Sequence, residues 1–194
     1  MSTVAEQTYT PEDLLTMPEG EKYELVDGQL VERKMSRVSN WVAGQVYQIV
    51  DSFVQKLELG WVWVADQGYV CFPNSPGKVR KPDVSFVRKE RLPDALTSDA
   101  GYVYIPPDLA VEVVSPNDEA REVENKVVEY LGVGVPLLWV IFPESRTAYM
   151  HRGDGSVVRL REEDELNGEK VLPGFRFRLS DVFPKKPAGE NGQG

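Results

Sequence analysis

The spacing of hydrophobic positions changes along the chain and predicts where helices form. Between Ser39 and Leu59 apolar residues recur every three or four positions, which is typical of an amphipathic helix. We expect Ser39 or Asn40 to cap the start of this helix and Gly60 to cap its end. A second helix, rich in Glu and Val, is expected over 117–131.

Shorter apolar runs predict strands around these helices. They lie at 61–70, 84–87, 109–114 and 137–142. The helix expected over 117–131 separates the last two runs. A strand, a helix and a strand in that order predict a right-handed crossover between parallel strands.

Turn residues predict a short first helix and two hairpins. Thr10 followed by Pro11 is a helix-start signal, and this helix should end before Gly20. An Asp-Gly pair divides the apolar residues of 23–31, which predicts a tight hairpin. A second hairpin is expected over 147–160, around a Gly-Asp-Gly turn.

Length and composition fit one globular domain. The 194 residues are 41% hydrophobic and 27% charged, so we expect a single domain over 8–184 with flexible tails at 1–7 and 185–194. The predicted class is α/β (α+β), a mixed sheet flanked by helices with hairpin additions at both ends. The sequence has no 18-residue apolar run and no secretory leader, and we expect a cytoplasmic protein without membrane association.

The scarcity of soft ligands narrows the possible chemistry. Cys71 and His151 are the only cysteine and histidine, so zinc sites built from several such residues are excluded. A serine triad would need His151, and no nucleophile elbow lies near it. Any metal must therefore bind oxygen ligands, as Mg²⁺ or Mn²⁺ does. The net charge of -9 argues against a general nucleic-acid coat protein.

Two carboxylates and a lysine form the most informative set. Asp83 precedes an apolar strand, and Glu112 lies inside one, where burial is costly unless the group is paired, protonated or bound to metal. Taken singly, Glu112 could face solvent, Asp83 could be a turn residue and Lys126 a solvated helix residue. Taken together, the carboxylates could hold one divalent ion that Lys126 approaches from the next helix, with Tyr130 on the same helix face.

In their order along the chain, these residues resemble the Uma family, a bacterial family of restriction-endonuclease-like proteins in the PD-(D/E)XK nuclease superfamily. The matching segments are Pro82-Asp83, Glu112-Val113-Val114-Ser115-Pro116, Lys126 with Tyr130, and Gly132-Val133-Gly134-Val135-Pro136. The resemblance covers about residues 8–184. It implies a restriction-endonuclease-like fold and a metal-dependent endonuclease acting on nucleic acid, DNA above all. Asp83 and Glu112 would bind Mg²⁺ or Mn²⁺.

The resemblance also implies roles for Lys126 and Glu24. In the usual superfamily motif the lysine follows the acid by two positions, where this chain has Val114. The resemblance implies that Lys126 supplies the amine from the neighbouring helix instead. Glu24 matches a recurrent family position near the site, but it could equally be an exposed strand residue or the partner of an arginine. Many members carry a histidine just before the long helix, where this chain has Ser39-Asn40-Trp41.

Several flanking residues allow two interpretations. The basic residues near Asp83 could follow a phosphate backbone, but we favour a solvated strand edge; they are Lys78, Arg80, Lys81, Arg88, Lys89 and Arg91. Gln67 or Asp66 could line the same cleft. The tryptophans, Trp41, Trp61, Trp63 and Trp139, are expected in the core rather than as base-stacking platforms. The run 61–64 lacks clean alternation, and a homodimer could cover both of its faces.

Two further functions stay open beside the endonuclease. The acidic charge and the missing histidine favour a non-catalytic binding or assembly module of the same fold. A metal-dependent hydrolase of a small phosphorylated substrate would need no basic groove. The surroundings of Asp83 and Glu112 discriminate among them. A wide positive groove favours DNA, a closed pocket favours a small substrate, and a filled site favours the non-catalytic module.

Overall fold

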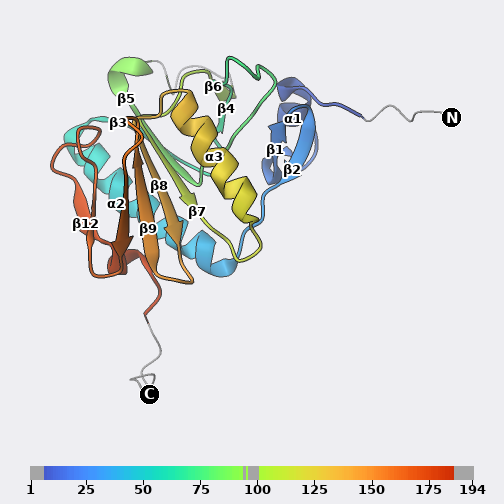
Figure 1. The fold of residues 1–194 in the computed structure, drawn as a ribbon. Helices are drawn as coiled ribbons and strands as arrows, with labels where there is room; N and C mark the ends of the chain where they lie inside the picture. Colours follow the sequence, from blue (N-terminus) through green and yellow to red (C-terminus); the bar gives the residue numbers. More distant parts are fainter. Residues whose placement is uncertain (1–6, 94, 96–100, 186–194) are drawn as a thin grey trace.

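A six-stranded mixed sheet forms the centre of the protein (Figure 1). The computed structural model describes residues 7–93, 95 and 101–185, so the tails expected at 1–7 and 185–194 fall almost wholly outside it. The strand order is β10-β9-β8-β7-β5-β3. These strands are β3 (Gly60–Val64), β5 (Val84–Arg88), β7 (Leu109–Val113), β8 (Leu137–Phe142), β9 (Thr147–Arg152) and β10 (Val157–Arg161). The α/β class predicted from the sequence is confirmed.

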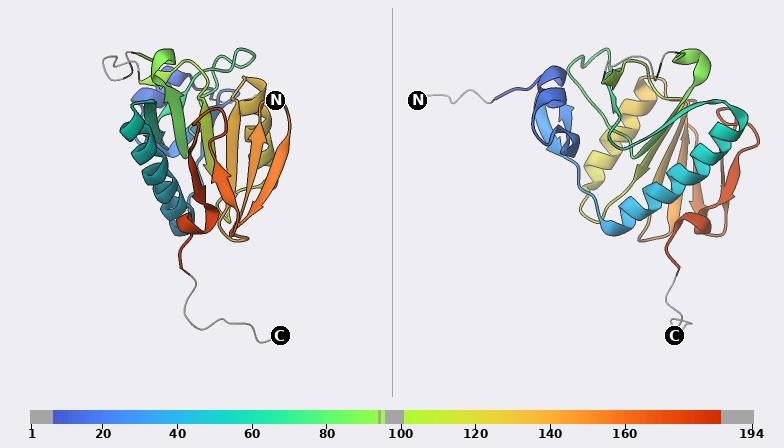
Figure 2. Two further views of the ribbon diagram at one scale, coloured as in Figure 1. Left: turned by 90° about the vertical axis from the view of Figure 1, so that its left-hand side faces the viewer. Right: turned by 180° about the vertical axis from the view of Figure 1, so that it is seen from behind.

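The two long helices cover opposite faces of this sheet (Figures 1 and 2). They are α2 (Arg37–Leu57) and α3 (Ala120–Gly132). Side chains alternate between the faces of a strand, so Val111 and Trp139 pack in the core under α2. Ala110 and Leu138 pack in the core under α3. Strands β7 and β8 are parallel and α3 joins them, which confirms the predicted parallel crossover.

The remaining elements are short and surround the sheet. The N-terminal ones are α1 (Pro11–Thr16), η1 (Gly20–Lys22), β1 (Tyr23–Val26) and β2 (Gln29–Glu32). β4 (Gly68–Tyr69) pairs with β6 (Tyr102–Val103), and β11 (Glu165–Asn167) pairs with β12 (Arg176–Arg178). The two further 3-10 helices are η2 (Lys89–Arg91) and η3 (Leu179–Val182). Among the described residues, no helix combines the length and hydrophobicity needed to cross a membrane.

The β1–β2 hairpin forms where the Asp-Gly pair predicted it. Asp27 and Gly28 both have positive φ, 51° and 78°, as a tight hairpin turn requires. The hairpin lies beside α3, outside the central sheet (Figure 1). Hydrogen bonds between the backbones of Leu25 and Val79 join it to the segment that leads into β5. The hairpin therefore faces the helix that follows β7.

Three elements begin or end at residues other than those expected. The cap of α2 is Ser36, not Ser39 or Asn40, and Glu58 in the left-handed region ends the helix before Gly60. A turn from Val64 to Gln67 divides the strand expected over 61–70 into β3 and β4. Helix α3 begins at 120 rather than 117, because a hydrogen-bonded turn between Ser115 and Asp118 precedes it.

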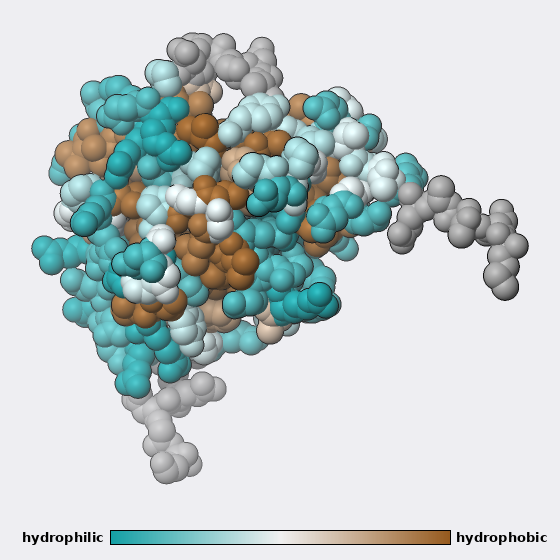
Figure 3. All heavy atoms as spheres, turned by 45° about the horizontal axis from the view of Figure 1, so that its top comes forward, coloured by the Kyte–Doolittle hydropathy of each residue, from teal (hydrophilic) through white to brown (hydrophobic). Residues whose placement is uncertain are grey.

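The tryptophans are not all core residues. Trp139 is buried among aromatic side chains, whereas Trp41 is 54% exposed because Val42 and Ala43 take the core face of α2. Trp61 and Trp63 are half-buried. Figure 3 shows that hydrophobic residues reach the surface in several places on one face of the molecule, with hydrophilic residues around them.

The observed cap of α2 generates a stability prediction. The Ser36 hydroxyl accepts a hydrogen bond from the Ser39 backbone N–H at 3.0 Å, and Ser39 Oγ accepts one from the Ser36 backbone N–H at 2.8 Å. Ser36→Ala should lower the free energy of unfolding by about 1 kcal/mol in urea denaturation. Asn40→Ala, at an exposed helix position, is the control and should leave it unchanged or slightly higher. A larger loss for Asn40→Ala would contradict this cap.

Candidate active site

Strands β5 and β7 bring Asp83 and Glu112 to the same level of the sheet. The strands are antiparallel, with Val84 opposite Val111, and one further step of this register pairs Asp83 with Glu112. Asp83 Oδ2 accepts a hydrogen bond of 2.7 Å from the backbone N–H of Val113. The turn residue before β5 is thus fixed to the carboxyl end of β7.

Glu112 points toward α3 because strand alternation sends its neighbours Val111 and Val113 to the other face. It is only 7% exposed, so it does not lie on a half-solvated strand. Its Oε2 accepts a hydrogen bond from Lys126 Nζ at 2.9 Å, and its Oε1 accepts one from the Tyr130 hydroxyl at 3.0 Å. Tyr130, expected on the same helix face as Lys126, is fully buried.

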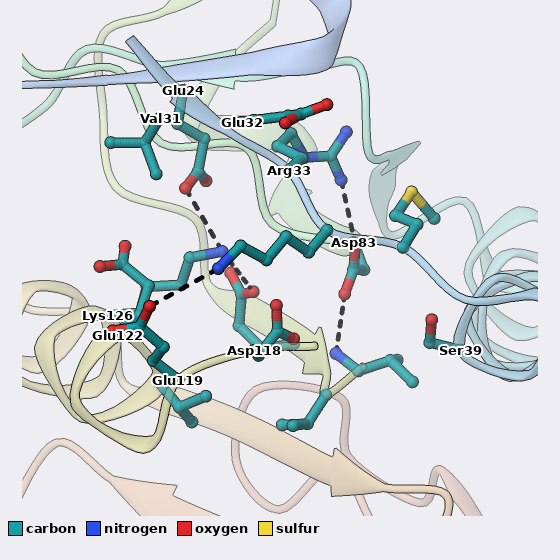
Figure 4. Close-up of a pocket in the computed structure, with 16 residues that line it drawn as sticks. Glu24, Val31, Glu32, Arg33, Ser39, Asp83, Asp118, Glu119, Glu122 and Lys126 are labelled. Carbon is teal, nitrogen blue, oxygen red and sulfur yellow. Dashed lines mark hydrogen bonds and ion pairs between the residues drawn. The ribbon is translucent and has the colours of Figure 1, made fainter. Parts of the chain in front are cut away.

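Glu24 joins the same group from the hairpin. Its Oε1 accepts a hydrogen bond from the backbone N–H of Lys81 at 2.8 Å, and its Oε2 accepts one from Arg80 at 2.9 Å. Lys126 Nζ lies 3.3 Å from the same Oε2. The structure therefore brings Glu24, Asp83, Glu112 and Lys126 together from four separate segments (Figure 4).

The basic residues near Asp83 divide into two groups. Lys78, Arg80 and Lys81 are buried, so the expectation of a solvated edge was wrong for these three. Arg80 donates to Glu24, to Glu122 at 2.9 Å and to Glu129 at 2.7 Å, and Lys81 Nζ donates to the carbonyl of Gly20 at 2.8 Å. Lys89 and Arg91 are exposed, as a solvated edge requires, and Arg91 forms an ion pair with Asp108 at 2.9 Å.

The four residues line one pocket that encloses about 180 Å³. Seven acidic and three basic residues contribute to its wall; they are Glu24, Glu32, Asp83, Glu112, Asp118, Glu119 and Glu122, with Arg33, Lys34 and Lys126. Neither Asp66 nor Gln67 is among them, and Gln67 instead donates to the backbone of Gly68 and Gly101. Ser39, one of the three residues in place of the family histidine, does line the pocket.

Burial and neighbouring charges shift the pKa values of the three carboxylates in different directions. Burial, together with Asp83 and Glu24, raises the pKa of Glu112 to about 7, although Lys126 opposes the shift. Burial also raises the pKa of Asp83. Burial alone would raise the pKa of Glu24, but Lys126 and Arg80 outweigh it and lower that pKa to about 2. Three carboxylates outweigh the burial of Lys126 and raise its pKa, so its ammonium stays charged.

The donor set fits a hard divalent ion by its chemistry. Asp83 and Glu112 present carboxylate oxygens to one pocket, and such oxygens are what Mg²⁺ and Mn²⁺ prefer. The pKa of each group is raised mainly by burial and further by neighbouring carboxylates, and a bound cation would offset both effects. Within the described part of the chain, no three Asp, Glu, His or Cys side chains are already grouped as metal ligands. A bound ion would therefore displace some of the hydrogen-bond donors that now contact these oxygens.

Comparisons with known proteins agree with this architecture. The chain shares its fold with a crystal structure from Anabaena variabilis described as "a putative nuclease belonging to DUF820", with a TM-score of 0.76 and 18% identity over 90% of this chain and 97% of that one. The fold is thus of the restriction-endonuclease-like class. A family model described as "Putative restriction endonuclease" matches residues 11–180, and the chain belongs to this Uma2 family. A search of curated proteins finds no match.

Two arginines of the site were not assigned to it from the sequence. Arg33 donates to Asp83, and Arg80 was placed on a solvated edge although it organises three acidic residues. The partners lie 50 and 56 positions away from Asp83 and Glu24 respectively, so local spacing carried no signal for either contact. The glutamates of α3 were the feature of the sequence that could have indicated partners for Arg80.

The raised pKa of Glu112 predicts how stability depends on pH. An acid that binds its proton more tightly in the folded state stabilises the fold at low pH, and this contribution is lost as pH rises from about 4.5 to about 7. The loss should reach about 3 kcal/mol at most. Glu112→Gln should remove this part of the pH dependence in urea denaturation.

Glu124→Gln is the matched control, because Glu124 is an exposed residue of the same helix that carries Lys126. It should keep the wild-type dependence on pH. Identical pH profiles for wild type and Glu112→Gln would contradict the raised pKa of Glu112.

Proposed function

We propose that this pocket is the active site of a metal-dependent endonuclease, in which Asp83 and Glu112 hold Mg²⁺ or Mn²⁺. The observation that carries the proposal is the convergence of three side chains in one pocket: the buried Glu112 of β7, the mostly buried Asp83 just before β5, and Lys126, whose Nζ is 2.9 Å from Glu112. Membership in a family described as restriction endonucleases supports phosphodiester hydrolysis as the reaction. We expect nucleic acid, DNA above all, as the substrate.

The side chains of the site would orient the reacting groups and stabilise negative charge. When bound, the ion would lower the pKa of a water and stabilise negative charge on the phosphate. Tyr130 donates to one oxygen of Glu112 and thereby turns the other toward Lys126. Glu24 lies on the other side of Lys126 and holds the ammonium over the pocket. Lys126 would there stabilise developing negative charge or orient the attacking water.

A non-catalytic binding module is the second candidate, and one specific observation favours it. Every carboxylate oxygen of Asp83 and Glu112 already accepts a hydrogen bond from a protein donor. Such a filled site is what a module that had lost its metal would retain. The absence of the family histidine, in whose place Ser39-Asn40-Trp41 stand, also favours the non-catalytic module. Metal binding separates the two candidates, because only the endonuclease requires it.

Replacement of Lys126 tests the proposed chemistry. Lys126→Met keeps the packing of the stem and removes the charge, and protonation of Glu112 limits the cost of the lost partner. Cleavage of plasmid DNA in Mn²⁺ should fall by roughly a hundredfold or more. Lys56→Met, at an exposed position of α2, is the matched control and should cut like wild type.

Calorimetric titration with Mn²⁺ should show one site that Asp83→Ala and Glu112→Ala abolish. Equal binding by wild type and both variants would show that Asp83 and Glu112 do not hold the metal. A site that binds Mn²⁺ but cleaves only a small phosphodiester would assign the pocket to a small substrate instead.

Self-association is a separate prediction. β3 lies at one edge of the sheet, and Val64 at its end is 47% exposed, so a second copy could cover the 61–64 run. Sedimentation over a wide concentration range should give the mass of a homodimer, and Val64→Lys should return it to the monomer. A monomer at every concentration would reject the dimer. The cytoplasmic location expected from the sequence likewise stays a prediction.

A further inference from the structure

Arg33 projects into the pocket from the end of the hairpin. It follows β2 directly, and its side chain is only 9% exposed. Its Nη2 donates a hydrogen bond of 3.1 Å to Asp83 Oδ1. Figure 4 shows Arg33 approaching Asp83 from the hairpin. Lys126 approaches Glu112 from α3, so each carboxylate proposed to hold the metal contacts a cation.

The two cations are held to different degrees. Lys126 contacts both Glu112 and Glu24, at 2.9 and 3.3 Å. Among the described residues, Asp83 is the single side-chain hydrogen-bond partner of Arg33. A guanidinium has five N–H donors in a planar fork, so most of the donors of this nearly buried group are left unused. Arg33 therefore has capacity to bind a second anion within the pocket.

We propose that Arg33 is a phosphate-binding residue of this pocket, and that it pairs with Asp83 only while Asp83 is free of metal. The inference rests on the proposed metal site. A divalent ion on Asp83 competes directly with the guanidinium for the same carboxylate. Released from Asp83, Arg33 can present its planar fork to phosphate oxygens, for which that geometry is suited.

The charges of the inner pocket favour this order of events. Seven acidic and three basic side chains line the pocket, so its charge is negative. A divalent ion offsets part of this charge and supplies a positive centre to which a phosphodiester can bind. Without the ion, the pocket would repel a phosphate, so metal and phosphate should bind in that sequence.

The exchange requires only the side chain of Arg33 to move. The backbone N–H of Arg33 donates to the carbonyl of Lys22 at 2.8 Å, which fixes the chain at the end of the hairpin. The rest of the hairpin is tied to the segment before β5 through Leu25 and Val79. The guanidinium can thus leave Asp83 for a phosphate while the hairpin stays in place.

The test measures two ligands on one variant. Arg33→Gln removes the competing cation, so Mn²⁺ should bind about tenfold more tightly in calorimetry, in line with the loss of a charge-assisted hydrogen bond to the carboxylate. Inorganic phosphate, titrated in saturating Mg²⁺, should bind at least about tenfold more weakly to the same variant. A general disturbance of the pocket would weaken both ligands, so opposite signs identify the proposed role.

Two further variants make the result specific. Arg37→Gln removes a positive charge from an exposed residue at the start of α2 that does not line the pocket. It should change both affinities by less than about threefold. Arg33→Lys keeps the charge without the planar fork. It should bind Mn²⁺ like wild type and bind phosphate with an affinity between those of wild type and Arg33→Gln.

Failure of this inference looks different from failure of the metal site. If wild type binds Mn²⁺ through Asp83 but Arg33→Gln binds it no more tightly, or keeps wild-type affinity for phosphate, the role of Arg33 is wrong and the metal site stands. If wild type binds no Mn²⁺, or binds it equally after Asp83→Asn, the metal site and the role of Arg33 are both overturned.

Discussion

The guanidinium of Arg80 is the contact on which the geometry of the pocket depends. It is 1% exposed and donates to Glu24 of the hairpin and to Glu122 and Glu129 of α3. A buried arginine is tolerated only with such partners, and loss of any partner leaves an uncompensated charge where water has little access. The hairpin and α3 are therefore held at a fixed separation. Lys126 extends from α3 and contacts Glu24 of the hairpin and Glu112 of β7.

This arrangement gives neighbouring carboxylates unlike properties. Glu24 accepts hydrogen bonds from Arg80 and from a backbone N–H, and these partners, with Lys126, keep it ionised. Glu112 has no cation of its own, because it shares Lys126 with Glu24, and it lies close to Asp83. Burial and this unshielded repulsion favour its protonated form. The same surplus of negative charge would be relieved either by a proton or by the divalent ion proposed for this pocket.

The sequence predicted the parts of this site that depend on local pattern. Alternation along β7 placed Glu112 within an apolar strand, and the resemblance selected Asp83, Lys126 and Glu24, which the fold brings into one pocket. Contacts between distant segments were not predictable in this way. Lys78, Arg80 and Lys81 were judged by the usual exposure of basic residues, and the acids that bury them come from elements around 50 positions away. The cap of α2 was misplaced because Ser36 and Ser39 are both good capping residues, and reciprocal hydrogen bonds decide between them.

The position of the amine on α3 has a structural consequence. Val114, where the usual motif has its lysine, instead packs with the apolar core under α3. Lys126 reaches Glu112 from the helix, so the charge lies beside the carboxylate even though it is attached elsewhere along the chain. A lysine on β7 would be fixed by the sheet. A lysine on α3 is fixed only as well as the helix is, and Arg80 anchors that helix through Glu122 and Glu129. In this protein the proposed chemistry is therefore coupled to a buried ion-pair network that lies outside the two carboxylates proposed to hold the metal.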